Sequence, residues 1–369
     1  MRAVAGVCTV LLAAMAVAGE WSLSSVQLLD SNGTRSSLWD GTVCFLTGPT
    51  GPINYFDGDS IYQPYSGAEN CYEPSNANGI IAFRVVMPTD SNNEIYRWDG
   101  ETLLNISSSP NNDCAADVGS NGDVIWSQDH TWLYYFSAET GESTPLGIAG
   151  RNPQLYITPE GVPTFAYQDP YTYEVVYFDG ETTRVLGAGA RYSAMISLWD
   201  GAVAWLAEGA GPDFTNAELM FWKDGVLTRI TNDDAEPIQD DFPSVWNGSV
   251  VWSRYPKGPF AGGRLFVWDG EETHQLTTTN AKYASFHNCQ VTYMGADGLY
   301  MADLVRVADT NCDGMLNAFD IDPFVLALTN PEDYAATYPD CSVMSADINL
   351  DGLVNAFDID PFVQVLVGG

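Results

Sequence analysis

A repeat of about forty residues runs through most of the chain and limits what the chain can fold into. Each unit has a turn, then small and β-branched residues, then an aromatic residue. The seven segments are LWDGTVCF (38–45), NANGIIAF (76–83), GSNGDVIW (119–126), TPEGVPTF (158–165), LWDGAVAW (198–205), VWNGSVVW (245–252) and FHNCQVTY (286–293). Six of the turns end in glycine and the last ends in Cys289, which predicts tight turns with positive φ.

A second landmark follows inside most units, as in INYFDG, IYRWDG, VVYFDG and LFVWDG. Short β-rich stretches separated by Asp-Gly or Asn-Gly turns, about four to a unit, predict an all-β propeller. Seven blades are expected, or six if the first or last unit is degenerate. The aromatic residues that end the seven segments are expected to pack between blades: Phe45, Phe83, Trp126, Phe165, Trp205, Trp252 and Tyr293.

The seventh unit lacks a final strand, because the chain leaves it after GLYMADL (298–304). The stretch WSLSSVQLLD (21–30) could supply that strand and close the ring, which would remove exposed sheet edges. The repeats resemble those of TolB-type propellers. That resemblance implies a scaffold that binds a ligand at its central face.

The nonapeptide NAFDIDPFV occurs twice, at 317–325 and 355–363, behind DTNCDGML (309–316) and DINLDGLV (347–354). Joined, they read D-x-N-x-D-G-x-x-N-x-x-D, the calcium loop of an EF-hand, and oxygen ligands at this spacing suit Ca²⁺. Two calcium ions are therefore expected. The first loop would use Asp309, Asn311, Asp313, the Met315 carbonyl, Asn317 and Asp320; the second would use Asp347, Asn349, Asp351, the Leu353 carbonyl, Asn355 and Asp358.

Each loop is followed by an Asp-Pro pair, Asp322-Pro323 or Asp360-Pro361, which resembles a helix N-cap with proline at the first helical position. Asn330-Pro331 starts a linking helix in the same way.

The duplicated loop–helix unit, 306–369, resembles a type I dockerin, a small all-α module. The resemblance implies calcium-dependent attachment to a cohesin-like domain. The sequence departs from the family at loop positions 10 and 11. The family often has a Ser-Thr pair there, whereas this chain has Ala318-Phe319 and Ala356-Phe357. Those four residues either contact the partner or serve packing. The basic residues usual in the helix are also missing, since no Lys or Arg follows Arg306.

The first eighteen residues have the pattern of a cleaved signal peptide, an arginine before an apolar run and a small-x-small site. The expected organisation is therefore 1–18 signal peptide, 19–305 propeller and 306–369 dockerin-like domain. The protein would be secreted or lie on the periplasmic side of the cell envelope. A formal net charge of −34 argues against nucleic-acid partners, and no later apolar run is long enough for a membrane span.

Six cysteines follow the predicted signal peptide, and an even number in an exported chain suggests disulfides. Cys312 and Cys341 are predicted to staple the C-terminal module. Among the other four, Cys71–Cys114 and Cys44–Cys289 are the preferred pairs, because they occupy equivalent or adjacent places in the ring. The alternative is that some are free buried thiols.

No catalytic motif is recognisable, and the catalytic residues are unknown. None of His130, His274 and His287 has an obvious nucleophile or metal partner in sequence, and the pairs Asp233-Asp234 and Asp240-Asp241 are expected to be solvated. Three hypotheses remain. The chain is a docking protein whose propeller binds a protein or glycan, a carbohydrate-active enzyme of polysaccharide catabolism (a glycoside hydrolase or lyase), or a structural extracellular or envelope protein.

Overall fold

The computed structural model describes residues 21–368 except 66, 68–69, 88–91, 192, 209–216, 233–237, 257–261, 314 and 340. The predicted signal peptide lies outside the described residues. The chain divides into two compact units. One spans Val26–Ala302 and the other joins residues 21–25 to residues 303–368.

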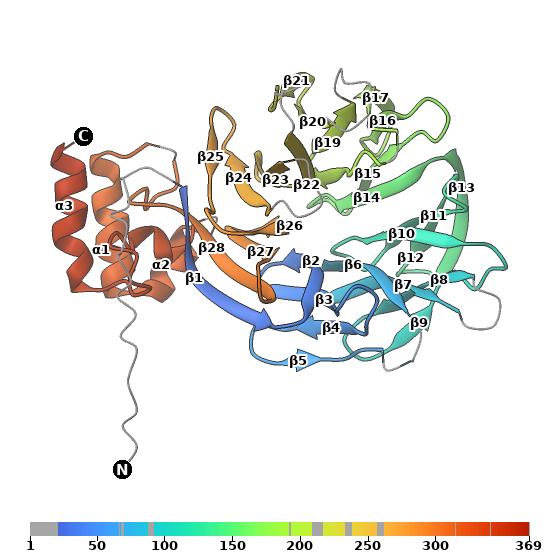
Figure 1. The fold of residues 1–369 in the computed structure, drawn as a ribbon, viewed down its shortest axis with the longest axis horizontal. Coiled ribbons are helices and arrows are strands. Elements are labelled where there is room, and N and C mark those ends of the chain that lie inside the picture. The colour runs from blue at the N-terminus through green and yellow to red at the C-terminus, as the bar shows by residue number, and fades with distance from the viewer. Residues whose placement is uncertain are drawn as a thin grey trace, which may run out of the picture. The chain divides into compact units, whose positions relative to one another are not determined.

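Seven four-stranded antiparallel sheets form the blades of a propeller (Figure 1), which confirms the seven-blade prediction. Each blade is built from strands consecutive in sequence, except the last. The strands are: blade 1, β2 (Gly33–Trp39), β3 (Thr42–Thr47), β4 (Ile53–Phe56) and β5 (Ile61–Tyr62); blade 2, β6 (Cys71–Ala77), β7 (Ile80–Val86), β8 (Asn93–Trp98) and β9 (Leu103–Asn105); blade 3, β10 (Asp113–Val118), β11 (Val124–Gln128), β12 (Trp132–Ser137) and β13 (Glu142–Ala149); blade 4, β14 (Arg151–Ile157), β15 (Pro163–Gln168), β16 (Glu174–Phe178) and β17 (Thr183–Ala188); blade 5, β18 (Ser197–Trp199), β19 (Ala202–Glu208), β20 (Ala217–Lys223) and β21 (Val226–Arg229); blade 6, β22 (Ile238–Trp246), β23 (Ser249–Pro256), β24 (Arg264–Trp268) and β25 (Thr273–Gln275); blade 7, β26 (Lys282–His287), β27 (Gln290–Met294), β28 (Leu299–Arg306) and β1 (Trp21–Asp30).

The N-terminal strand closes the ring, as predicted. β1 is the outermost strand of blade 7, hydrogen-bonded to β28 in the order β1-β28-β27-β26. A strand from the start of the chain therefore completes a sheet whose other three strands come from residues 282–306.

The turn that follows each innermost strand has the predicted backbone. Positive φ occurs at Gly41, Gly79, Gly122, Gly161, Gly201, Gly248 and Cys289. In five of the seven turns the preceding Asp or Asn also has positive φ, the conformation of the two-residue hairpin turns that suit the twist of paired strands.

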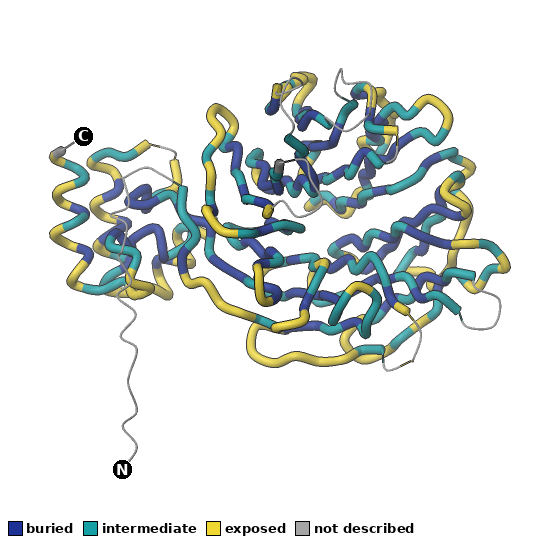
Figure 2. The backbone as a smooth tube through the Cα atoms, viewed as in Figure 1, coloured by how far each residue is buried: buried dark blue, intermediate teal, exposed yellow. Residues whose placement is uncertain are grey.

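The aromatic residues that end the repeats lie in the core, which confirms that they serve packing. Trp126, Trp205 and Trp252 are among the largest fully buried side chains, and Phe45 and Phe83 are buried as completely. Figure 2 shows this distribution along the chain: the second strands of the blades are largely buried, whereas turns and outermost strands carry most exposed residues.

The described part of the C-terminal unit contains three α-helices, α1 (Ile321–Thr329), α2 (Pro331–Thr337) and α3 (Ile359–Gly368). Phe324 of α1 stacks on Phe362 of α3 with ring centroids 3.9 Å apart. The fully buried Tyr334 of α2 donates its hydroxyl proton to the Thr310 carbonyl at 2.7 Å. These contacts join the two repeats through one apolar core.

The helix starts differ in part from the prediction. Asn330 caps α2 with Pro331 at the first turn, as expected. Asp322 and Asp360, however, lie inside α1 and α3 and are not N-caps. A 3₁₀ turn precedes each helix and is capped by Asn317 or Asn355, whose side chain accepts a backbone N–H, so the helical segment begins earlier than the proline suggested.

One of the three predicted disulfides is present among the described residues. Cys312 and Cys341 are bonded across 29 residues, with Cα atoms 5.8 Å apart. The predicted bridges Cys71–Cys114 and Cys44–Cys289 are not formed. Cys44 and Cys114 are buried thiols instead. Cys44 packs in an apolar cluster, and the Cys114 sulfur points back into its own blade toward Ser127.

The part of the chain that the structure describes has no helix of sufficient length and apolar character to cross a membrane.

Candidate functional site

Every blade has one residue with left-handed backbone at the same place, within its innermost strand or, in blade 5, just before it. These residues are Arg35, Glu73, Ala115, Asn152, Met195, Phe242 and Tyr283, with φ between 40° and 59°. In six blades the ladder register shifts at this point, as in a β-bulge. In blade 5 the residue, Met195, lies two positions before the start of β18. Bulges re-aim backbone and side chains and are frequent beside binding sites.

A polar residue lies two positions beyond each bulge, and in six blades it links the blade to the next. We call this ring the belt: Ser37, Ser75, Asp117, Gln154, Ser197, Ser244 and Ser285. Six of its members accept a backbone N–H from the following blade. These donors are Asn76 to Ser37, Val118 to Ser75, Leu155 to Asp117, Val245 to Ser197, Phe286 to Ser244 and Leu38 to Ser285, at 2.7–3.1 Å. The last of these joins blade 7 to blade 1.

The bulges and the belt line a cavity of 470 Å³ at the centre of the propeller, which we call the central channel. All seven blades contribute to it, and its lining is rich in serine hydroxyls and in the amides of Asn152 and Gln154. Its charged side chains are Arg35, Glu73 and Asp117. Such a volume lies within the range of small-ligand pockets, about 300–1,000 Å³.

A layer with five aromatic members lies two residues further along the chain, beyond the belt. We call it the plug, and its members are Trp39, Ala77, Gly119, Tyr156, Trp199, Trp246 and His287. Trp39 of blade 1 contacts Trp199 of blade 5, with ring centroids 5.3 Å apart, although these blades are not neighbours. Contact between such distant blades means that the side chains meet across the axis. The central channel is therefore closed at this end.

His287 is the polar member of the plug. It stacks on Trp39 with ring centroids 4.4 Å apart and meets Trp199 edge-on at 4.7 Å. Its Nδ1 accepts the backbone N–H of Asp40, and its buried Nε2 has no hydrogen-bond partner among the described residues. Burial lowers the pKa of His287 to about 4, so the ring is neutral at physiological pH.

Asp117 is the acidic member of the belt. Burial raises its pKa to about 6, although the hydroxyl of Ser75 and the backbone N–H of Leu155 both donate to its carboxylate and act in the opposite direction. In five blades a serine stands at this position, so Asp117 brings a proton that can exchange near neutral pH to an otherwise hydroxyl-lined ring.

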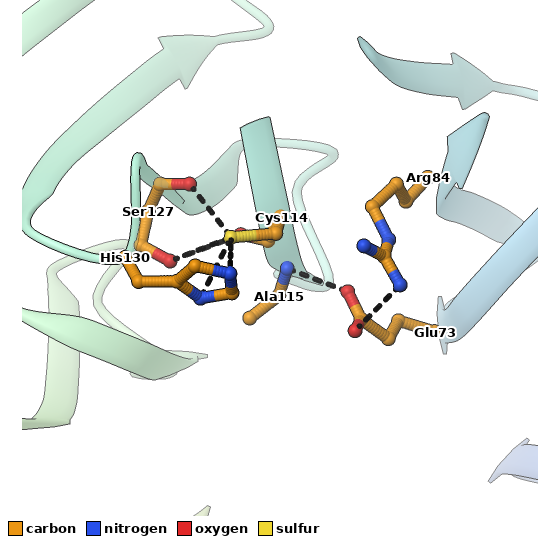
Figure 3. Close-up of polar contacts among 6 residues, drawn as sticks. All are labelled: Glu73, Arg84, Cys114, Ala115, Ser127 and His130. Atoms are coloured by element: carbon orange, nitrogen blue, oxygen red, sulfur yellow. Dashed lines mark hydrogen bonds and ion pairs between the residues drawn. The ribbon is translucent and has the colours of Figure 1, made fainter. Parts of the chain in front are cut away.

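Next to the bulge residue Ala115, the structure brings together two residues that the sequence did not connect (Figure 3). The Cys114 sulfur lies 3.2 Å from His130 Nδ1, a distance suited to a thiol and its base. Cys114 is fully buried, however, and burial raises the pKa of its thiol. A buried neutral thiol is a poor nucleophile, so this contact is structural.

Figure 3 also shows how the bulges of blades 2 and 3 are joined. The Glu73 carboxylate accepts the backbone N–H of Ala115 at 2.7 Å and forms an ion pair with Arg84 at 3.1 Å. The charge of Glu73 is thus compensated within the protein. His274, the third histidine, pairs with Asp269 in blade 6 at 3.2 Å.

Asp240 and Asp241 are buried in β22, so the expectation that they are solvated was wrong. Asp240 accepts from the Trp252 indole N–H at 2.9 Å and from Arg254 at 2.8 and 3.1 Å. Burial, together with the neighbouring Asp240 charge, raises the pKa of Asp241 to about 7. Asp233-Asp234 lies outside the described residues.

We expect Asp241→Asn to remove part of the pH dependence of stability. The folded-state pKa of about 7 exceeds the ordinary value of 3.8, so the unfolded chain loses this proton first as pH rises. Asp241 therefore lowers the free energy of unfolding progressively between about pH 4 and pH 7, by about 4 kcal/mol in total. Urea unfolding at pH 4.5 and pH 8 should show that the variant gains stability over the parent only at the higher pH.

The exposed Asp59 provides the control for this experiment. Asp59→Asn removes the same charge at an exposed turn and should leave the pH dependence of the parent unchanged. A constant difference between Asp241→Asn and the parent at both pH values would contradict the assignment.

The two predicted calcium loops share the hydrogen bonds of their last residue. The last loop residue, Asp320 or Asp358, is fully buried and accepts two N–H groups from the loop start, from Thr310 and Asn311 or from Ile348 and Asn349, at 2.8–3.3 Å. Its other oxygen accepts the N–H of Asn317 or Asn355 at 2.9 Å. The duplicated sequence thus folds into a duplicated loop, apart from Gly314, which is not described.

The chemistry of the loops fits calcium. Carboxylate, amide and carbonyl oxygens are the hard ligands that Ca²⁺ takes in flexible geometry. Burial, assisted by the charges of Asp358 and Asp351, raises the pKa of Asp347. Among the described residues there is nonetheless no group of three or more Asp, Glu, His or Cys side chains at metal-binding spacing. Several predicted ligand oxygens instead accept N–H groups of the loop.

The fold and the central channel define a seven-blade β-propeller with a small helical unit. Comparisons with known proteins give information on the propeller. No protein-family model matches the chain, and no curated protein sequence is significantly similar to it. Among solved structures, the chain is similar to the WD40 repeats of RRP9, with 9% identity, a TM-score of 0.53, and 77% of this chain and all of that one covered.

Two further solved structures are similar to the chain. An acylaminoacyl peptidase in complex with Z-Gly-Gly-Phe-chloromethyl ketone matches with 11% identity over 74% of this chain and a TM-score of 0.51. The match spans only 52% of the peptidase, about half its length. TolB from Acinetobacter baumannii matches with 15% identity, a TM-score of 0.41, and coverage of 76% of this chain and 63% of TolB. At such identities the similarity concerns the fold alone.

Proposed function

We propose that the protein is a calcium-dependent docking protein. Its C-terminal unit would bind two calcium ions through the loops 309–320 and 347–358 and attach the chain to a cohesin-like domain. Its propeller would bind a protein or glycan ligand at the central channel. The observation that carries the proposal is the internal duplication of the C-terminal unit, in both its loops and its exposed apolar residues.

The exposed residues come in matched pairs, one from each repeat. Phe319 and Phe357 are 77% and 78% exposed, which is unusual for phenylalanine. The other pairs are Met315 with Leu353, Ile321 with Ile359, and Val325 with Val363. Apolar residues gathered at equivalent exposed places favour partner contact over packing for Phe319 and Phe357 and for the adjacent Ala318 and Ala356. Either repeat could then engage the partner.

Secretion is part of the same proposal. A disulfide between Cys312 and Cys341 is typical of proteins that fold in an oxidising compartment, in agreement with the predicted signal peptide. The acidic surface agrees with a soluble protein that binds divalent cations.

Calcium titration of the full chain tests the metal assignment. Calorimetry should detect two calcium ions per chain, and Asp313→Ala with Asp351→Ala should abolish both binding events. A control with the same charge change, Asp59→Ala with Glu332→Ala, alters exposed acids outside the loops and should bind two ions. Unchanged calcium binding by the loop variant would refute the assignment.

The same proteins test docking on an immobilised type I cohesin domain. The parent should be retained with calcium and released by EDTA, and Phe319→Ala with Phe357→Ala should lose retention while still binding two calcium ions. Retention that is indifferent to calcium, or no retention of a calcium-loaded parent, would rule out the proposed mode of docking.

A further inference from the structure

The central channel offers hydrogen-bond donors that the protein does not use. The belt serines accept N–H groups from neighbouring blades through their oxygen, which leaves the hydroxyl proton to donate elsewhere. Within the described structure, the hydroxyl protons of Ser37, Ser197 and Ser285 have no protein acceptor. Ser75 differs, because it donates to Asp117. Blades 1, 5 and 7 therefore each present a free donor in the channel lining.

The charges of the lining nearly cancel. Glu73 is paired with Arg84, which leaves Arg35 at the bulge and Asp117 in the belt. A cation in the channel would meet the Arg35 guanidinium, and an anion would meet the Asp117 carboxyl. A neutral ligand rich in groups that both donate and accept hydrogen bonds meets neither penalty.

The shape of the cavity limits which part of such a ligand can enter. The plug closes the channel beyond the belt through the contact of Trp39 with Trp199. A polymer cannot pass through and can only insert an end. Phe242 and the prolines at 74, 153 and 243 give the lining apolar faces that the C–H groups of a ring can contact.

We infer that the central channel binds the end of a neutral carbohydrate chain, held by the belt hydroxyls, Gln154 and Asp117. This inference rests on the proposed role of the propeller as a ligand-binding unit and names the ligand class. It requires no step of catalysis.

The test uses the full chain with calcium present and two sets of probes. The first set is D-glucose, D-mannose, D-galactose, D-xylose and their β-1,4-linked dimers, and the second is the peptide Gly-Gly-Phe. We expect saturable binding of at least one sugar by calorimetry or ligand-observed NMR, with dissociation constants of about 1 mM or below. No saturable binding of any sugar at concentrations up to about 50 mM would overturn the inference.

Two channel variants locate the site. Gln154→Trp places a large ring in the channel and should weaken sugar binding at least tenfold. Its matched control, Val226→Trp, puts the same ring on the exposed strand β21 and should bind as the parent does. Gln154→Leu, which removes the amide with little change in size, should also weaken binding and serves if the tryptophan variant does not fold. Binding that both Gln154 variants leave intact would overturn the inference.

The outcomes separate this inference from the proposed function. The channel variants should still bind two calcium ions and the cohesin column. Binding of Gly-Gly-Phe but no sugar, lost in Gln154→Trp, would overturn the carbohydrate assignment and leave a ligand-binding propeller. If the parent protein binds no calcium, the docking proposal is refuted, whereas the inference of sugar binding is not affected.

Discussion

A chain that begins at residue 31 should unfold with a free energy about 5 kcal/mol below that of the intact protein. It lacks β1, so blade 7 loses its outermost strand and β28 becomes an exposed edge. A ten-residue strand along a sheet edge forms about five backbone hydrogen bonds of about 1 kcal/mol each. Urea unfolding followed by tryptophan fluorescence measures the change.

Adding the missing strand back provides the control. A synthetic peptide with the sequence WSLSSVQLLD should raise the unfolding midpoint of the shortened chain, and a scrambled peptide of the same composition should not. An identical midpoint for the shortened and intact chains would show that β1 contributes nothing to closure of the ring.

Asp240→Ala is expected to lower the free energy of unfolding by about 3–5 kcal/mol. Asp240 is fully buried and holds the Arg254 guanidinium in a two-pronged ion pair, while it also accepts the Trp252 indole N–H. Removing the carboxylate leaves a half-buried cation and a buried donor without this partner. Chemical unfolding at pH 7 measures the loss.

Blade 3 contains the matched control at the equivalent position. Asp113 is also fully buried and accepts from the Trp126 indole, but its other partners are the neutral Ser109 and Gln128. Asp113→Ala should therefore cost about 1–3 kcal/mol, the penalty for unsatisfied neutral donors. Equal losses in the two variants would mean that the Arg254 ion pair is not what stabilises blade 6.

The fold could be predicted from local signals because each blade repeats them. A turn residue with positive φ recurs in all seven blades, and the residue that ends each repeat is buried in every blade. The disulfides could not be predicted equally well. Equivalent places in neighbouring blades do not bring two sulfurs together when, as at Cys114, the side chain turns into its own blade.

The sequence also contains a signal for the channel lining, but its meaning is clear only once the fold is known. A serine stands four residues before the turn residue in five repeats, at positions 37, 75, 197, 244 and 285, and those serines are five of the seven members of the belt. Their meaning depends on the ring, because the donor to each hydroxyl comes from the next blade. The burial of Asp240 and Asp241 was missed because a pair of acids in sequence gives no sign of the Arg254 and Trp252 that surround it.

The contact between Trp39 and Trp199 has a consequence for how the propeller comes apart. In an open array of repeats each unit touches only its neighbours, so units can melt one after another from the ends. Here blade 1 and blade 5 share a direct contact across the axis, and the belt joins the last blade to the first. A substitution that destabilises one blade should therefore also destabilise blades across the axis. The propeller is thus expected to unfold more cooperatively than an open array of similar repeats.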